Sequence, residues 1–353
     1  MSSNGNPCIL YGELYTKYKS EIISEVISKT NIEKNKLKHS KQNDVIIPCS
    51  GETAVDIAVA RCVPFDNVLL GGDLNIIRLH KYDGAFMAYQ LNSKRKIEIA
   101  KLAQGVSVVH LYGENLKSIN TFNPSLQEQQ KIVRLLSLLD ERIKVQNKII
   151  EKLKSLIKGL NNILLYGTEG KSVCLGDILL ERSERSRTNN QHEVLSSTVK
   201  GIFSQREYFS KDIASENNVG YKIIRLHDVV LSPQNLWMGN INYNDRFEIG
   251  IVSPSYKVFS IADGFDNQFV AAMLKSHRAL YSYIMVSEQG ASIVRRNLNM
   301  EAFSQLVFKI PSLDKQREIG YEISLLKSQL KTANKIIRAY TSQKQYLLRQ
   351  MFI

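Results

Sequence analysis

Two segments of the chain carry the same long run of apolar residues in alternating steps of four and three. In residues 124–171 the run extends from Ile132 to Leu164, and in residues 311–353 from Ile319 to Met351. A repeat of 3.5 residues sustained over this length is typical of a coiled-coil seam. Each segment is therefore predicted to form one helix of roughly 40 residues, roughly 60 Å long at 1.5 Å per residue.

The two helices are predicted to pair through these apolar positions. The pairing residues are Ile132, Leu136, Leu139, Ile143, Ile150, Leu153, Ile157, Leu160 and Leu164 in the first helix, and Ile319, Ile323, Leu326, Leu330, Ile337, Tyr340, Leu347 and Met351 in the second. Gln146, Ala333 and Lys344 fall in the same seam. The alternative is two separate surface helices, which a narrow seam of this length disfavours because it needs a long partner.

The two helical segments are copies of each other. A shift of 187 residues, from Pro124 to Pro311, superimposes them without a gap, and both begin with Pro-Ser-Leu-x-x-Gln. A proline at a helix start loses no hydrogen bond, because its missing N–H has no partner there. Ser125 and Ser312 are predicted N-caps, and Glu128 completes a capping box with Ser125.

The segments before and between the helices have a different pattern. Residues 1–123 and 172–310 are rich in β-branched and aromatic residues punctuated by Asn, Gly and Ser, which favours mixed α/β domains. They repeat each other weakly, with Asp44–Pro48 near the position of Asp228–Pro233. The predicted fold class is α+β, with two tandem mixed α/β domains joined by two long helices that form an antiparallel coiled coil.

The repeat is asymmetric at its beginning. The second globular domain opens with Val173–Ile178, about 53 residues before Asp228. The same distance before Asp44 falls ahead of Met1. The first domain is therefore expected to lack its opening strand, either as a shortened form or because another chain completes it.

Composition narrows the functional class. Charged residues make up 23% of the 353 residues and hydrophobic residues 43%, as in ordinary globular proteins. The sequence has neither an apolar run near the ~20 residues that span a bilayer nor the features of a signal peptide, so a cytoplasmic location is expected. The four dispersed cysteines predict neither a metal site nor a disulfide framework. The net charge of +13 favours a polyanionic partner, although a basic protein without a nucleic-acid role remains an alternative.

Motifs for catalysis are missing from the sequence. It contains neither the D/N/S-P-P-[FYW] tetrapeptide of amino-methyltransferases nor a G-x-G-x-x-G after a strand. Gly170-Lys171-Ser172 matches the end of a phosphate-binding loop, but Leu165 stands where that motif needs its first glycine. The six histidines show no metal-ligand spacing. The chain is expected to be a binding protein without a catalytic site, a metal or a cofactor of its own.

The chain resembles the specificity (S) subunits of type I restriction–modification systems over essentially its whole length. The motifs that carry the resemblance are the Pro124–Gln129 and Pro311–Gln316 helix starts, Ile46–Thr53 and Leu70–Asp73 in the first domain, and Ser232–Gly239 and Gly250–Tyr256 in the second. Each motif alone is weak, but their order and duplication make the resemblance specific.

The resemblance implies a DNA sequence-recognition subunit. Residues 1–123 and 172–310 would be two target-recognition domains, each reading one half of a bipartite target in double-stranded DNA. Residues 124–171 and 311–353 would set the spacer and dock two methyltransferase subunits, with restriction/translocase subunits joining the complex. S-adenosylmethionine, ATP and Mg would be bound by these partners, and the methylated base is expected to be adenine.

Candidate DNA-contacting residues follow from side-chain chemistry, because bases are read in the major groove mainly by Arg, Lys, Asn and Gln. In the second domain they are Arg182, Arg185, Arg187, Asn189, Asn190, Gln191, Gln234, Asn235, Asn240, Asn242, Asn244, Arg295, Arg296 and Asn297. In the first domain they are Thr16, Lys17, Lys19, Lys94, Arg95 and Lys96. Asn-rich stretches also build turns, which is the alternative for each such residue. Trp237 is expected to be a core anchor.

A rival interpretation is a coiled-coil interaction scaffold that does not recognise DNA. A fused methyltransferase is disfavoured by the missing motifs. Salt distinguishes the scaffold from the specificity subunit, because DNA affinity that depends on phosphate contacts falls steeply as salt increases.

Overall fold

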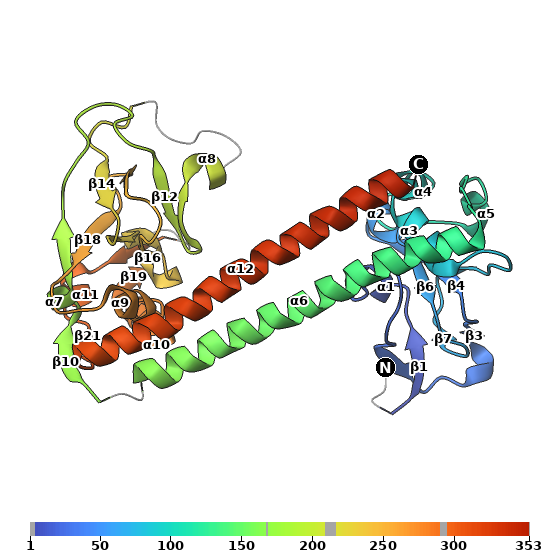
Figure 1. Ribbon diagram of the computed structural model, residues 1–353, viewed down its shortest axis with the longest axis horizontal. Coiled ribbons are helices and arrows are strands. Elements are labelled where there is room, and N and C mark those ends of the chain that lie inside the picture. Colours follow the sequence, from blue (N-terminus) through green and yellow to red (C-terminus); the bar gives the residue numbers. More distant parts are fainter. Residues whose placement is uncertain (1–3, 167–168, 209–216, 290–294, 353) are drawn as a thin grey trace. The chain divides into compact units, whose positions relative to one another are not determined.

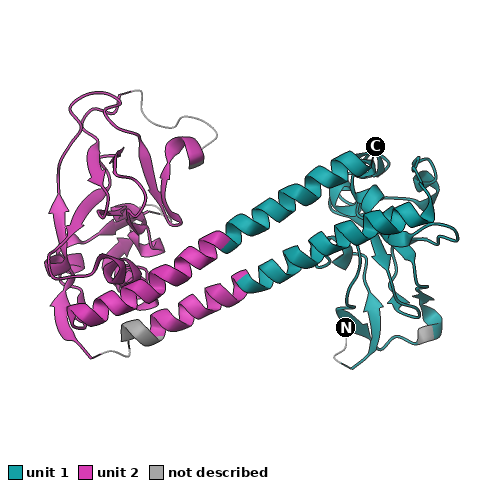
Figure 2. Ribbon diagram, in the orientation of Figure 1, with its two compact units in different colours: residues 1–149, 333–353 teal, residues 150–332 magenta. Residues whose placement is uncertain are grey.

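The chain divides into two compact units. The computed structural model describes residues 4–166, 169–208, 217–289 and 295–352 (Figure 1). Unit 1 comprises Met1–Ile149 with Ala333–Ile353, and unit 2 comprises Ile150–Thr332 (Figure 2). Each unit therefore contains one globular domain together with a part of both long helices.

Unit 1 is built on short strands. One sheet has the order β2-β1-β7-β3, formed by β1 (Asn6–Ile9), β2 (Ser28–Thr30), β3 (Lys38–His39) and β7 (Leu69–Leu70). A second has the order β6-β4-β8, formed by β4 (Asp44–Pro48), β6 (Arg61–Val63) and β8 (Leu74–Ile77), and β5 (Ser50–Gly51) pairs with β9 (Val109–His110). The helical elements are α1 (Glu13–Thr16), η1 (Lys34–Lys36), α2 (Ala54–Ile57), α3 (Gly84–Asn92), α4 (Arg95–Lys101) and α5 (Gly113–Leu116). Helix α3 contacts β4 and β6 and is buried along most of its length.

Unit 2 has a four-stranded sheet of order β11-β18-β15-β16, formed by β11 (Leu179–Arg182), β15 (Val229–Leu231), β16 (Ile241–Tyr243) and β18 (Lys257–Ile261). The antiparallel pairs are β10 (Lys171–Cys174) with β21 (Val307–Ile310), β12 (Leu195–Thr198) with β13 (Gly201–Ser204), β14 (Lys222–Arg225) with β17 (Ile249–Val252), and β19 (Ser287–Gln289) with β20 (Arg296–Leu298). The helical elements are α7 (Leu175–Ile178), α8 (Gln205–Tyr208), η2 (Pro233–Met238), α9 (Asn267–Met273), α10 (His277–Met285) and α11 (Met300–Ser304).

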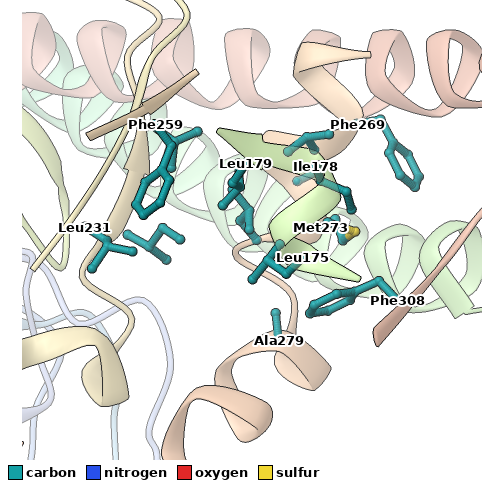
Figure 3. Close-up of a cluster of buried hydrophobic side chains, with 14 of the residues drawn as sticks. Leu175, Ile178, Leu179, Leu231, Phe259, Phe269, Met273, Ala279 and Phe308 are labelled. Atoms are coloured by element: carbon teal, nitrogen blue, oxygen red, sulfur yellow. The ribbon is translucent and has the colours of Figure 1, made fainter. Parts of the chain in front are cut away.

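The core of unit 2 gathers around its opening elements. Leu175 and Ile178 of α7 are fully buried and pack with Phe269 of α9, as the close-up in Figure 3 shows. Phe259 of β18 and Phe308 of β21 belong to the same cluster. The segment β10–α7–β11 is therefore part of the hydrophobic core and not a surface addition.

The same turn precedes the central strand in both units. Asn43 and His227 have positive φ angles of 76° and 75°, and each is followed by a buried aspartate. The Asp44 carboxylate accepts a hydrogen bond from Lys41 N, and the Asp228 carboxylate accepts one from Arg225 N. The weak sequence repeat therefore corresponds to a repeated local structure.

The two long helices are α6 (Leu126–Tyr166) and α12 (Leu313–Met351), of 41 and 39 residues. Their seam residues are buried or half-buried, whereas most residues between them are exposed. The side chain of Leu164 lies outside the described residues. At the start of α6, Glu128 N donates to Ser125 Oγ and Ser125 N donates to Glu128 Oε2. This is the predicted capping box.

Within unit 1 the two helices run antiparallel. Gln146 Nε2 donates to Ala333 O over 3.2 Å, and farther along the pair the guanidinium of Arg142 lies 5.7 Å from the ring centroid of Tyr340. Closer to the start of α6, Asp140 forms an ion pair with Lys344. The residue numbers rise on one helix as they fall on the other, so the predicted α+β fold with an antiparallel helix pair is confirmed.

The four-stranded sheet of unit 2 and the three-stranded sheet of unit 1 differ at one edge. In unit 2, β18 lies between β15 and β11, whereas in unit 1 the corresponding strand β8 ends its three-stranded sheet. In unit 2, β21 pairs with β10 along four residues, from Lys171↔Ile310 to Cys174↔Val307. Among the described residues of unit 1, no strand takes the place of β10 or β11.

Candidate nucleic-acid interface

A buried glutamine joins the globular domain of unit 1 to the start of α6. Gln129 is fully buried, and its Oε1 accepts a hydrogen bond from Asp83 N at 2.9 Å. Its Nε2 donates to Pro124 O at 2.8 Å. Asp83 is the N-cap of α3, where its carboxylate accepts from Phe86 N. One carboxamide therefore links the beginnings of two helices.

Unit 2 contains the same joint. Gln316 is 2% exposed, its Oε1 accepts from Asp266 N at 3.0 Å, and its Nε2 donates to Pro311 O at 3.0 Å. Asp266 caps α9 by accepting from Phe269 N. The last residue of each Pro-Ser-Leu-x-x-Gln motif thus fixes a domain helix to a long helix. The sequence revealed the repeated glutamines but not their partners.

Different arginines neutralise the two buried aspartates. In unit 2, Arg182 at the end of β11 donates to both oxygens of Asp228 at 2.9 Å. In unit 1, which has no counterpart of β11 among its described residues, Arg78 after β8 donates to both oxygens of Asp44 at 2.8–2.9 Å. Burial raises the pKa of Asp228, and the Arg225 N–H and the Arg182 guanidinium oppose that rise. Each buried carboxylate therefore has a guanidinium partner.

A side chain also replaces a strand pairing in unit 1. The segment before Pro124 corresponds to β21 of unit 2, which is held by β10. In unit 1, Gln90 Nε2 donates to Phe122 O at 2.6 Å and Phe122 N donates to Gln90 Oε1 at 3.0 Å. Gln90 is 3% exposed, so its carboxamide provides the donor and acceptor that a neighbouring strand supplies in unit 2. In unit 1 a side chain therefore holds this segment, whereas in unit 2 a neighbouring strand does so.

Five of the predicted DNA-contacting residues lie together on one exposed loop of unit 2, between β11 and β12: Arg185, Arg187, Asn189, Asn190 and Gln191. The loop is anchored by the buried Asn218, which is 1% exposed. Asn218 N donates to Asn189 Oδ1, and Asn190 N donates to Asn218 Oδ1. The loop is therefore a polar and basic surface that is fixed by hydrogen bonds to Asn218. Arg185 also donates to Gly220 O, and the neighbouring Arg182 is engaged by Asp228 and Glu184.

The asparagines after η2 are mostly internal. Asn240, Asn242 and Asn244 are 4%, 4% and 1% exposed. Asn242 Nδ2 donates to Thr198 O, and Asn244 Nδ2 donates to Phe247 O. These placements favour the turn-building alternative for the three asparagines over base contact. Gln234 is exposed and Asn235 is half-buried, and both lie in η2.

Arg296 stacks on the tryptophan of unit 2. Its guanidinium lies 4.4 Å from the ring centroid of Trp237, within the range of a cation–π interaction. Arg295 and Asn297 on either side are exposed. Trp237 is half-buried and stands outside the buried hydrophobic clusters of unit 2, so its ring is the platform on which Arg296 rests and not the expected core anchor.

The candidates of unit 1 fall on two elements. Thr16, Lys17 and Lys19 are exposed at the end of α1, where Lys17 pairs with Glu13. Lys94, Arg95 and Lys96 begin α4, where Arg95 pairs with Glu98. The preceding Ser93 donates to Leu348 O near the end of α12. The α4 group is therefore located beside the helix pair.

A charged cluster in unit 1 was not predicted from the sequence. Lys344 forms ion pairs with Asp140 at 2.5 Å and with Glu21 at 2.6 Å, and all three side chains are at most 14% exposed. The Tyr89 hydroxyl donates to Asp140, and burial followed by the charge of Asp140 raises the pKa of Tyr89. The only sequence signal was a lysine at an apolar seam position.

The described residues provide no sign of metal chemistry. No group of three or more His, Cys, Asp or Glu among them is arranged to hold an ion. In the same residues, no helix is both long and apolar enough to cross a bilayer.

Two related α+β domains, each fixed by the same glutamine joint to one of two paired helices, define a duplicated two-domain architecture. Residues 2–155 match the family model of the type I restriction modification DNA specificity domain. This match covers a little under half of the chain and includes the motifs of the first domain that carry the resemblance.

Solved structures share the fold at low sequence identity. The S subunit of a type I restriction–modification system from M. genitalium is 18% identical with a TM-score of 0.62, over 99% of this chain and 92% of that chain. A second structure, described as the structural basis underlying complex assembly and conformational transition of the type I R-M system, is 13% identical with a TM-score of 0.52, over 98% of this chain and 90% of that chain.

Proposed function

We propose that each globular domain reads one half of a bipartite DNA target and that the helix pair sets the length of the unread spacer. The observation that carries this proposal is the duplicated joint, Gln129 with Asp83 and Gln316 with Asp266. Two domains attached in the same way to one pair of helices are suited to reading two sites at a fixed separation. The exposed loop of Arg185–Gln191 is the candidate reading surface of unit 2.

The helix pair also carries an apolar surface that is not used in pairing. Leu138 and Ile149 of α6 are 50% and 42% exposed, and the residues 187 positions later, Leu325 and Ile336 of α12, are 42% and 38% exposed. These residues lie roughly 100° around each helix from the seam, at 3.6 residues per turn. We call this duplicated surface the outer stripe. An apolar surface that occurs twice in equivalent positions supports the docking of two identical partners, which we propose are methyltransferase subunits.

Charge substitutions in the outer stripe should remove these partners one at a time. We expect Leu138→Lys or Leu325→Lys to leave one bound methyltransferase subunit and the double variant to leave none. Each lysine would place a charge in a desolvated contact and weaken binding about 100-fold. Native mass spectrometry of the chain with its cognate methyltransferase measures the stoichiometry. Asn147→Lys, on the opposite side of α6, is the control, and two subunits on the double variant would contradict the assignment.

Lengthening the helix pair tests the spacer role. Seven residues inserted after Gln146 and seven after Ala333 preserve the heptad phase and lengthen the pair by about 10 Å. We expect the spacer to grow by about three base pairs, at 3.4 Å per pair, with both half-sites unchanged. Mapping methylated sites in cells that carry the variant and its cognate methyltransferase measures both.

An insertion in α6 alone is the control for this experiment, because it shifts one seam against the other and should abolish methylation. An unchanged spacer after the double insertion would refute the ruler function.

In this proposal S-adenosylmethionine, ATP and Mg are bound by the partner subunits, and restriction/translocase subunits complete the assembly in the cytoplasm. The absence of amino-methyltransferase motifs from the sequence supports this division of labour.

A further inference from the structure

We infer that Gln129 and Gln316 are positioning residues that hold each recognition domain at a fixed angle to its long helix and so determine how strictly spacer length is discriminated. This inference rests on the proposed function, because it concerns the fidelity of the ruler. It assigns a role to the last residue of each Pro-Ser-Leu-x-x-Gln motif.

Both glutamine joints are made to main-chain atoms. Each glutamine carboxamide uses its oxygen and its nitrogen on backbone atoms, Asp83 N and Pro124 O in unit 1 and Asp266 N and Pro311 O in unit 2. Backbone partners cannot rotate away as side-chain partners can. Both glutamines are at most 2% exposed, so water does not compete for these hydrogen bonds.

In unit 1 the joint holds a helix of the domain's interior. Asp83 caps α3, whose residues Phe86 and Tyr89 are at most 1% exposed. The joint therefore connects the long helix to the core of the domain and not to a mobile loop. A small rotation at this point moves every reading loop of that domain together.

The glutamine joint is common to both units, whereas other features of the units differ. The aspartate partners differ, with Arg78 in one unit and Arg182 in the other, and unit 1 uses Gln90 where unit 2 uses β10. The glutamine joint is retained with hydrogen bonds that agree within 0.2 Å. What the two domains share is the need for a defined angle to the helix pair.

Glutamine is the side chain that fits this joint. Glutamate has the same length but cannot donate to the proline carbonyl, and methionine provides neither hydrogen bond. Either change leaves at least one buried backbone group without its partner, which allows the domain to shift so that water can reach it.

The test is a comparison of methylation rates by the complete complex with its cognate methyltransferase. The DNA duplexes carry the target with its normal spacer or with one base pair more or fewer, and the ratio of the rates is the spacer discrimination. We expect Gln129→Met and Gln316→Met each to lower this ratio about fivefold, with the half-site sequences still required. Gln129→Leu, which also removes both hydrogen bonds, should give a similar ratio and serves if the methionine variant does not fold. Gln130→Met, an exposed neighbour on α6, is the matched control.

A purely structural role predicts a different result. In that case the variants would lower the melting temperature and the methylation rate on all duplexes equally, with the discrimination ratio unchanged, and this would overturn the inference. If the unsubstituted complex itself showed no spacer discrimination, the proposed ruler function would fail instead. The two failures are therefore distinguishable.

Discussion

Replacing Lys344 with methionine should lower the free energy of unfolding of unit 1 by about 3 kcal/mol. The substitution leaves Asp140 and Glu21, which are 14% and 10% exposed, without their shared cation. Breaking a buried ion pair from one side is strongly destabilising, because the remaining charges lack compensation. The Tyr89 hydroxyl continues to donate to Asp140 but cannot neutralise it.

The loss of stability can be assigned to one of the two units by spectroscopy. Its one tryptophan, Trp237, lies in unit 2. Denaturation followed by circular dichroism reports both units, whereas tryptophan fluorescence reports unit 2. We expect Lys344→Met to shift the circular dichroism transition and to leave the fluorescence transition in place.

Two further variants complete this experiment. Lys335→Met changes an exposed lysine of the same helix and should alter stability by at most about 0.5 kcal/mol. Lys344→Met with Asp140→Asn should recover part of the loss, because one of the two uncompensated carboxylates is gone. A loss below about 1 kcal/mol in Lys344→Met would show that the cluster is not a stabilising element.

Replacing Arg182 with methionine should destabilise unit 2 by about 3 kcal/mol, because Asp228, whose side chain is 4% exposed, loses both guanidinium hydrogen bonds. This effect should appear in the fluorescence of Trp237. The matched variant, Arg78→Met, removes the partner of Asp44 in unit 1 and should appear in circular dichroism alone. Its effect should be smaller, because Arg78 is 39% exposed to water whereas Arg182 is 26% exposed.

The loss in Arg182→Met should depend on pH with a defined sign. Burial already holds the pKa of Asp228 above the ordinary value of an aspartate, and removing Arg182 removes an opposing influence. A carboxyl with a raised pKa in the folded state favours folding at low pH and ceases to do so as the pH rises through that pKa. The deficit of Arg182→Met against the unsubstituted chain should therefore be larger at pH 8 than at pH 5, and a deficit equal at both values would contradict this account.

The long helices could be predicted from the sequence, because a heptad pattern depends only on the spacing of apolar residues along the chain. Every seam position from Ile132 to Leu160 is at least half-buried, and the capping box at Ser125 forms as expected. The repeat likewise predicted that Asp44 and Asp228 occupy equivalent positions. These features depend on residues close together in the chain or on direct comparison of the two copies.

The candidate interface was less predictable because polarity does not reveal the direction of a side chain. Asn242 and Arg187 are both polar residues in loop-like sequence, yet Asn242 is buried among backbone acceptors and Arg187 is exposed. The partners of Gln129 and Lys344 are 46 and 204 residues away in sequence, at Asp83 and Asp140. Such contacts arise only when the fold brings distant segments together.

The use of Gln90 in place of a strand pairing has a consequence for mutational tolerance. A ladder such as β10 with β21 is made of main-chain atoms and persists with almost any side chains, apart from proline. A contact made by a carboxamide depends on one particular codon. Single-nucleotide changes at the Gln90 codon should therefore damage the first domain, whereas most such changes in β10 should be accepted by the second, and random mutagenesis of the gene should reveal this difference.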